Sequence, residues 1–271
     1  QVINLEPEFI KKQDGQQKQD CENAAVKRWL DKNHQKKYGY PVTLLGDDLY
    51  SRQPICELAL KQGYNFIFVC LETSHKTLYE WREFLEKSGE VKTGEKKQWD
   101  GRKNLIYRYR YVSRVPLREV ESSLEVNWCE VTVINEKTQK IIYQNNWITN
   151  HQITENNVEK IVKAGRSRWK VENEANSVLK NHGYNLEHNF GHGQSHLCEF
   201  LLSLNLLAFL FHTVLDLVNH TYQKIRELLV TRTSFFNDIR TLLKYFWFKN
   251  WSEFFLFILT EYVPLKKINS S

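Results

Sequence analysis

Residues 40–48 read YPVTLLGDD and residues 65–71 read NFIFVCL, and these two short stretches decide the fold. Each is a nearly unbroken apolar run, which is typical of a strand covered on both faces of its sheet. Between them, residues 53–61 have helical spacing, with Pro54 in the first turn, where a helix tolerates proline. Buried strands that alternate with helices indicate an α/β fold.

The pattern changes to antiparallel β structure between residues 73 and 150. Polar and apolar residues alternate along residues 104–115, and residues 125–135 and 140–149 continue in this style, with NEKTQK as a hairpin turn. Helical patterns return at Thr154, and one continuous helix is predicted to contain RSRWKVENEANSVLK, residues 166–180. The chain therefore divides into four segments: 1–72, 73–150, 151–195 and a helical 196–271.

Composition excludes several classes of protein. With 41% hydrophobic and 26% charged residues among 271, the chain can bury a core and is not disordered. A net charge of +6 favours polyanionic partners such as nucleic acid. The five cysteines contain no CxxC pair, so neither a disulfide framework nor a zinc ribbon is predicted, and buried thiols of a cytoplasmic protein are expected.

The strongest apolar run covers residues 197–215 and contains Glu199, Asn205 and His212. A lipid-facing helix would not easily tolerate these three polar side chains. We therefore predict a buried helix in this region rather than a membrane span, and no signal peptide is expected at the N-terminus.

Two pairs of carboxylates are candidate site residues. Asp47 and Asp48 end the first strand, at the edge of an α/β sheet where sites are commonly built, although a strand-end aspartate is also ordinary turn chemistry. Glu172 and Glu174 each follow a basic residue four positions earlier, so a solvated, charged helix face is the alternative for them.

Helical geometry separates Glu172 from Glu174. At about 100° per residue, the two glutamates fall on opposite flanks of a predicted buried stripe, so they cannot both serve one site. This stripe consists of Val171, Ala175, Val178 and Leu179. Glu172 shares its flank with Arg168, an arrangement that could hold a metal ion beside a phosphate.

Two further patterns are less specific. The segment from Lys92 to Arg118 mixes basic residues with Trp99 and three tyrosines, which suits phosphate contact and base stacking, and a solvated antiparallel strand is the alternative. His188, His192 and His196 recur every four residues, which could indicate a metal site, but Gly191 and Gly193 argue against a continuous helix there.

In several separated blocks the sequence resembles the DDE transposases of bacterial insertion sequences. The blocks are LLGDDLYSRQPIC, a following strand and long β insertion, and RSRWKVENE, LK and GYNLEHNFGHG. The resemblance implies an RNase H-like core whose first part is 1–72 with its early strands missing. It also implies an antiparallel β insertion at 73–150, the last catalytic-core helix and following loop at 151–195, and a helical C-terminal region at 196–271.

The resemblance also implies a catalytic site. Asp47, supported by Tyr50, would be one catalytic and metal-binding carboxylate, and Glu172 of an Arg-x-x-x-Glu motif would be another. Asp48 and Glu174 remain the alternatives within each pair. The chain departs from the family at Gly165, where the family has tyrosine, and at Lys180, which lies one position further from Glu172 than usual. The family's first aspartate would precede Gln1, so a fragment is expected.

The implied function is DNA transposition by phosphoryl transfer at transposon ends, with Mg²⁺ or Mn²⁺ as cofactor. The expected DNA contacts are Arg168, Lys170, Lys180, Arg108 and Arg110. A catalytically dead DNA-binding remnant and a related metal-dependent nuclease are the alternatives. Without the first aspartate, the chain is expected to bind DNA weakly and not to cut it. We expect a bacterial cytoplasmic, nucleoid-associated protein with DNA rather than membrane as its partner, and a homodimer is a candidate assembly.

Overall fold

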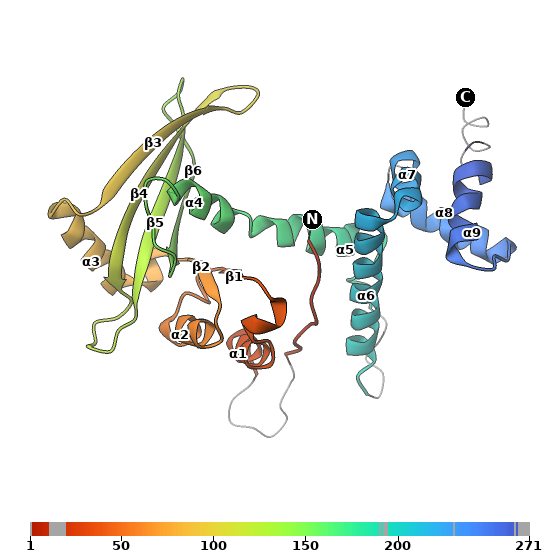
Figure 1. Ribbon diagram of the computed structural model, residues 1–271, viewed down its shortest axis with the longest axis horizontal. Coiled ribbons are helices and arrows are strands. Elements are labelled where there is room, and N and C mark those ends of the chain that lie inside the picture. The colour runs from red at the N-terminus through yellow and green to blue at the C-terminus, as the bar shows by residue number, and fades with distance from the viewer. Residues whose placement is uncertain are drawn as a thin grey trace. The chain divides into compact units, whose positions relative to one another are not determined.

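The chain separates into two compact units, each with its own core. The computed structural model describes residues 2–10, 20–189, 191, 195–229, 231–262 and 264. The sheet unit is Glu8–Arg168, and the helical unit consists of Gln1–Pro7 and Trp169–Ser271. The α/β class expected from the sequence is confirmed, because the sheet unit is built on one six-stranded mixed sheet with helices packed against it (Figure 1).

The sheet has the strand order β1-β2-β6-β5-β4-β3. Its strands are β1 (Thr43–Gly46), β2 (Asn65–Val69), β3 (Lys92–Trp99), β4 (Asn104–Pro116), β5 (Glu125–Asn135) and β6 (Ile141–Thr149). β1 and β2 run parallel, and each of the other neighbouring pairs is antiparallel. Because β6 is hydrogen-bonded to β2, the antiparallel strands of segment 73–150 extend the same sheet as the first two strands.

Helices cover both faces of this sheet. The core on one face joins the strands to α1 (Glu22–Lys32), α2 (Gln53–Lys61) and α3 (Lys76–Lys87). The core on the other face lies under α4 (Val158–Arg166). The helix predicted at residues 53–61 is confirmed, whereas the purely β structure predicted from residue 73 is wrong at α3. That helix buries Leu78 and Tyr79 against the sheet, and its apolar stripe lies among many charged residues.

Gly165 allows α4 to lie close to β6. A Cβ atom at this position would lie 2.7 Å from Nε1 of the buried Trp147, which is far inside van der Waals contact. The position therefore has no room for the tyrosine of the resembled family. The departure noted in the sequence is a packing feature of this chain.

The single helix predicted through residues 166–180 is wrong. α4 ends at Arg166, and Ser167 closes the turn by donating through Oγ to the carbonyl oxygen of Ala164 at 2.6 Å. Such a side-chain bond competes with the helical ladder. Beyond the turn, the chain continues as the π-helical segment η3 (Val171–Asn176) and then as α5 (Ser177–Asn181).

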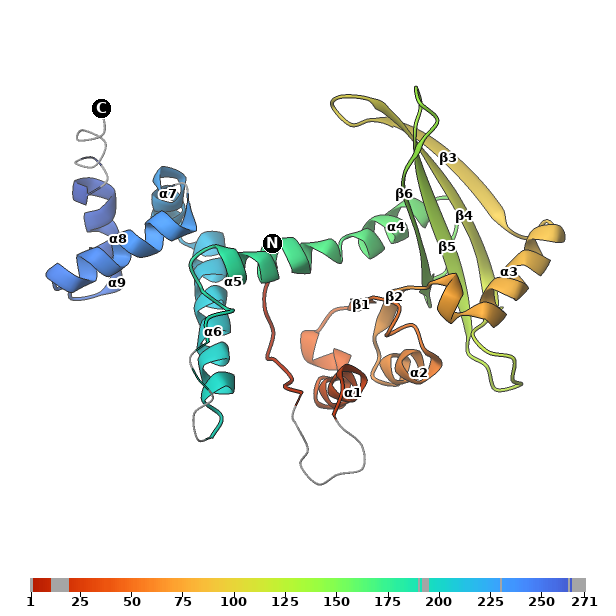
Figure 2. The ribbon, with the colours of Figure 1, turned by 180° about the vertical axis from the view of Figure 1, so that it is seen from behind.

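The rest of the helical unit contains α6 (Leu197–Val218), α7 (His220–Leu228), α8 (Arg232–Tyr245), α9 (Trp251–Phe257) and the π-helical η4 (Ile258–Tyr262). α7, α8 and α9 share an aromatic core and lie together in both views (Figures 1 and 2). α6 alone among the described helices is long and apolar enough to cross a membrane, by length and composition only. The prediction that α6 is buried is wrong, because only Phe209 and Thr213 are buried in it.

Candidate functional site at the carboxyl end of β1

Asp47 follows β1 directly and forms a tight turn. Its Oδ1 accepts a hydrogen bond from the backbone N–H of Leu49 at 3.0 Å, and its carbonyl oxygen accepts one from the N–H of Tyr50 at 3.2 Å. Within the described residues, the second carboxylate oxygen, Oδ2, has no hydrogen-bond or ion-pair partner. Half of this carboxylate therefore remains available to a ligand.

Asp48 is bound to the neighbouring loop instead. Its Oδ1 accepts from the backbone N–H of Leu71 at 2.6 Å, and its Oδ2 accepts from the hydroxyl of Ser74. These bonds fasten the loop after β1 to the loop after β2. Both oxygens of Asp48 are thus used by the fold, which favours Asp47 as the residue that presents a free carboxylate oxygen.

A serine and a histidine beside Asp48 invite comparison with a hydrolytic triad. Ser51 Oγ lies 2.6 Å from His75 Nε2, but Asp48 Oδ1 also faces Nε2, at 3.7 Å. In a triad, the carboxylate binds the ring nitrogen that does not contact serine. Ser51 is also fully buried, and burial lowers the pKa of His75, with the charge of Asp48 opposing that effect. This cluster stabilises the loops and does not resemble a nucleophilic site.

Charged groups from three elements converge on Tyr50. Its hydroxyl donates to Glu22 Oε1 of α1. Burial raises the pKa of Tyr50, the bond to Glu22 and the charges of Glu22 and Asp47 raise it further, and the positive charge of Arg168 lowers it. Tyr50 is therefore a neutral donor at neutral pH, and Arg168 lies within electrostatic range of it. Sequence reasoning missed Glu22, because an acidic residue in the first turn of a helix is an ordinary complement to the helix dipole.

Four of the five expected DNA contacts have carboxylate partners. The pairs are Arg108–Glu95 at 3.0 Å, Arg110–Glu130 at 3.3 Å with a second bond from Arg110 to Glu86, Lys170–Glu174 at 3.9 Å and Lys180–Glu187 at 2.8 Å. Arg168 has no carboxylate partner in the part of the chain that the structure describes. Its guanidinium is thus the expected contact with the most available charge.

The tyrosines of β4 do not form a stacking surface. Tyr109 and Tyr111 are buried in the core beneath α4, and Tyr107 packs against the same core. Of the two alternatives for this segment, base stacking is closed to Tyr109 and Tyr111 by their burial, because the alternation that separates them from the arginines turns them toward α4. Trp99, at the end of β3, is 59% exposed and remains accessible.

Glu172 and Glu174 lie in the helical unit, within η3. Glu172 is exposed and accepts a hydrogen bond from Asn176 Nδ2 at 3.1 Å. The buried stripe predicted beside them is wrong at Val171, which is 48% exposed. A π-helix bonds i to i+5, so the α-helical step of about 100° does not apply in this segment. π-helical turns are frequent at functional sites.

Of the three histidines in this pattern, the structure describes His188 and His196. His196 Nδ1 lies 2.8 Å from Glu199 Oε2, and His192 lies outside the described residues. Throughout the described ranges, no group of three or more His, Cys, Asp and Glu side chains could hold a metal ion. Within the described residues, a metal ion at the predicted carboxylates would therefore have fewer than three of these side chains as ligands.

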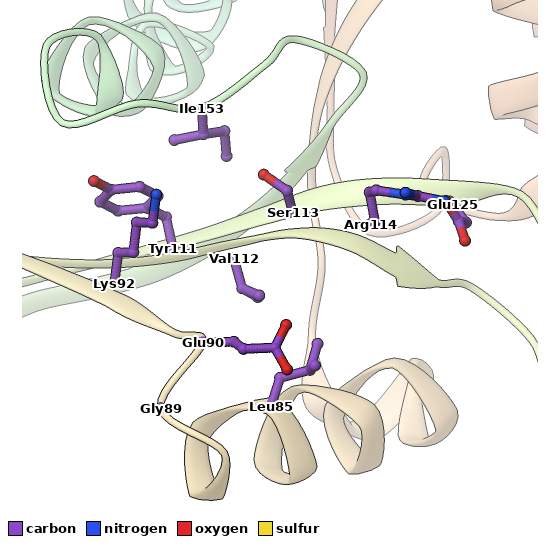
Figure 3. A pocket seen from close by; sticks show the side chains of 10 residues that line it. All are labelled: Leu85, Gly89, Glu90, Lys92, Tyr111, Val112, Ser113, Arg114, Glu125 and Ile153. Atoms are coloured by element: carbon purple, nitrogen blue, oxygen red, sulfur yellow. The ribbon is translucent and has the colours of Figure 1, made fainter.

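A pocket of about 570 Å³ opens on the other half of the sheet (Figure 3). It lies between the end of α3 and the bulged end of β4, and its lining includes Tyr111, Arg114 and Ile153. β4 is four strands from β1, or about 19 Å at the usual spacing between strands. The pocket is therefore separate from the carboxylates at the end of β1.

Comparison with known proteins assigns no family. No protein-family model matches the sequence, and no curated protein matches it either.

Proposed function

We propose that this chain acts on DNA by divalent-metal-dependent phosphoryl transfer, as a DDE transposase with an RNase H-like core. The observation that carries the proposal is the uncommitted Oδ2 of Asp47 at the carboxyl end of β1. In α/β proteins, functional sites are commonly built at the carboxyl ends of strands. Asp48, one residue later, supports the same geometry by fixing the loop that presents Asp47.

The donor set fits Mg²⁺ or Mn²⁺. Both ions prefer oxygen ligands and bind through one or two carboxylates together with substrate phosphates and water. Asp47 offers one such oxygen, and Glu172 is exposed and bonded only to a neutral amide in the described residues. When bound, the ion would supply Lewis-acid stabilisation of charge on a phosphate.

The chain's own residues would position the DNA. Arg168 has a guanidinium without a carboxylate partner in the described residues, and guanidinium groups bind phosphate in a bidentate manner. Tyr50 holds Glu22 by its hydroxyl and packs against Phe68, so it supports the turn that carries Asp47. A DNA substrate also fits a bacterial cytoplasmic, nucleoid-associated protein with a net charge of +6.

The first test compares two adjacent aspartates in the whole chain. In Asp47→Asn, we expect Mn²⁺ affinity to fall roughly tenfold or more, because a ligand is lost, with little change in the melting temperature. In Asp48→Asn, we expect the melting temperature to fall, because the bond between two loops is weakened. Titration calorimetry and thermal unfolding measure the two effects. Unchanged Mn²⁺ affinity in Asp47→Asn would remove the basis of the proposal.

A second test asks whether Asp47 and Glu172 serve one ion. Mn²⁺ affinity is measured for Asp47→Asn, Glu172→Gln and the double variant, with Glu174→Gln as the matched control. If both residues bind the same ion, the loss of Mn²⁺ binding free energy in the double variant differs from the sum of the losses in the two single variants. Additive losses would assign Glu172 to another role.

DNA carrying the terminal repeats that flank the coding sequence distinguishes the reaction classes. Joining of a repeat end to a second duplex in Mn²⁺ supports transposition. Hydrolysis without joining supports a related nuclease, and binding without either reaction supports a catalytically dead DNA-binding protein.

A further inference from the structure

The solvent-facing side of α6 is an unbroken apolar stripe. Six of its exposed side chains are Phe200, Leu204, Leu207, Phe211, Val214 and Val218, which are 40–71% exposed. Their spacing along the chain is four, three, four, three and four residues. Positions 200, 207 and 214 therefore recur every seven residues, as do positions 204, 211 and 218. This heptad recurrence is typical of the apolar seam in a left-handed coiled coil, where a second helix covers the seam. These six residues are called the α6 seam below.

The opposite side of α6 is fixed to its own unit by polar contacts. Asn205 Nδ2 donates to the carbonyl oxygen of Tyr184 at 2.7 Å, and His212 Nδ1 lies 2.8 Å from the hydroxyl of Tyr222. Phe209 is buried beside Ala175 and Leu179. These contacts hold the seam outward, so its exposure follows from how α6 packs in the helical unit.

A lipid surface suits this helix poorly. Helices that lie on membranes are typically rich in lysine and arginine on their polar face, and α6 contains neither residue. A spanning helix would carry Glu199, Asn205, His212 and Asp216 into hydrocarbon. Contact with another protein would bury only the apolar side of α6 and would leave these polar side chains out of hydrocarbon.

We propose that the α6 seam pairs antiparallel with the α6 seam of a second copy of this chain. In one antiparallel register, Phe200 lies opposite Val218 of the second copy, Leu204 opposite Val214, and Leu207 opposite Phe211. Each layer then combines a larger with a smaller side chain, as good core packing requires. A parallel pair would instead oppose phenylalanine to phenylalanine in two layers and valine to valine in two others.

The positions that flank the seam also suit self-association. Leu201, Ser203, Ala208, Leu210, Leu215 and Leu217 occupy them, and none carries a charge. Two copies therefore meet without like-charge repulsion, and a charged partner would find no complement on this face. Beside Phe211, an apolar cavity of about 520 Å³ between α6, α8 and α9 extends the surface that a second copy covers. This dimer goes beyond the proposed function and does not depend on it.

The assembly is tested on the whole chain by sedimentation and light scattering. We expect the wild type to be a dimer at micromolar concentration, and Phe211→Lys and Leu204→Lys to be monomers with unchanged helix content. Phe84→Lys on α3 is the matched control, because Phe84 and Phe211 are both 61% exposed, and it should remain a dimer. A monomeric wild type would overturn the proposal, as would dimeric seam variants.

Disulfide formation tests the register and does not rely on a destabilising variant. In a chain with Cys21→Ser and Cys198→Ser, the pair Leu204→Cys and Val214→Cys should form a covalent dimer on oxidation. Within one helix these positions are about 15 Å apart, too far for an internal disulfide. Leu204→Cys alone should stay uncrosslinked. Efficient crosslinking of that single variant, or flotation of the wild type with phosphatidylcholine–phosphatidylglycerol vesicles in place of dimerisation, would contradict the antiparallel pair.

Discussion

Gly165 lies where α4 crosses β6, with Nε1 of Trp147 only 2.7 Å from the place of a Cβ atom. Gly165→Ala should therefore lower the free energy of unfolding by about 1–3 kcal/mol, the usual cost of overpacking a buried contact. Urea denaturation measures the effect. Gly94→Ala in β3 is the matched control, because a Cβ there meets no atom within 4 Å. Equal stability of the two variants would show that Trp147 can move aside.

His212 makes the helical unit sensitive to acid. Burial lowers its pKa to about 4, and Arg232 and Arg226 add to the effect, while Tyr222 and Tyr184 also lie against the ring. The folded state favours the neutral ring. The contribution of His212 to the free energy of unfolding is therefore fully present above the ordinary pKa of 6.5, and it is lost as pH drops toward 4. The loss is on the order of 3 kcal/mol. Denaturation at a series of pH values should give a flatter profile for His212→Gln, and identical profiles would contradict this role.

At the level of elements, an arginine of β4 and an arginine that follows α4 differ in whether a carboxylate is paired with them. Arg108 is paired with Glu95, whereas Arg168, two residues beyond the end of α4, has no carboxylate partner within the described residues. We therefore expect Arg168→Ala to weaken duplex binding and to reduce the salt slope by about 0.9, the value for one phosphate contact. Arg108→Ala should change neither quantity appreciably. Fluorescence anisotropy over a range of salt concentrations compares them, and a larger effect at Arg108 would reverse the assignment.

Elements with strong local signals could be predicted from the sequence. The helix at Gln53–Lys61 has a proline at its start, and the strand at Glu125–Asn135 alternates clearly, and both are found at their predicted bounds. The break at Ser167 could not be predicted, because it depends on one side-chain bond to a carbonyl group. The exposure of α6 could not be predicted either, because an apolar run in the sequence looks the same whether the core of the protein or a second molecule covers it.

The candidate site was predictable only in part for the same reason. A strand-end Asp-Asp pair indicates a site, but the hydrogen-bond donors that occupy both oxygens of Asp48 belong to Leu71 and Ser74, which are more than twenty positions away. Glu22 reaches Tyr50 across a separation of 28 residues. Such long-range partners leave no local trace in the sequence.

At the level of the whole molecule, self-association would link stability to concentration. If two copies pair through the α6 seam, the melting temperature should rise with protein concentration, because only the folded chain forms the pair. Leu207→Lys should make the melting temperature independent of concentration. Calorimetry across a wide dilution series provides the comparison. A wild type whose transition does not shift would argue against the pair.

The two edges of the sheet differ in a way that matters for keeping the protein in solution. β3 carries Lys92, Lys96 and Lys97, and lysines on an edge strand discourage the addition of a foreign strand. β1, at the other edge, reads TLLG and carries no charge. Unwanted strand addition during overproduction should therefore begin at β1. A charged residue introduced along that strand is the change with which to improve the yield of dispersed protein.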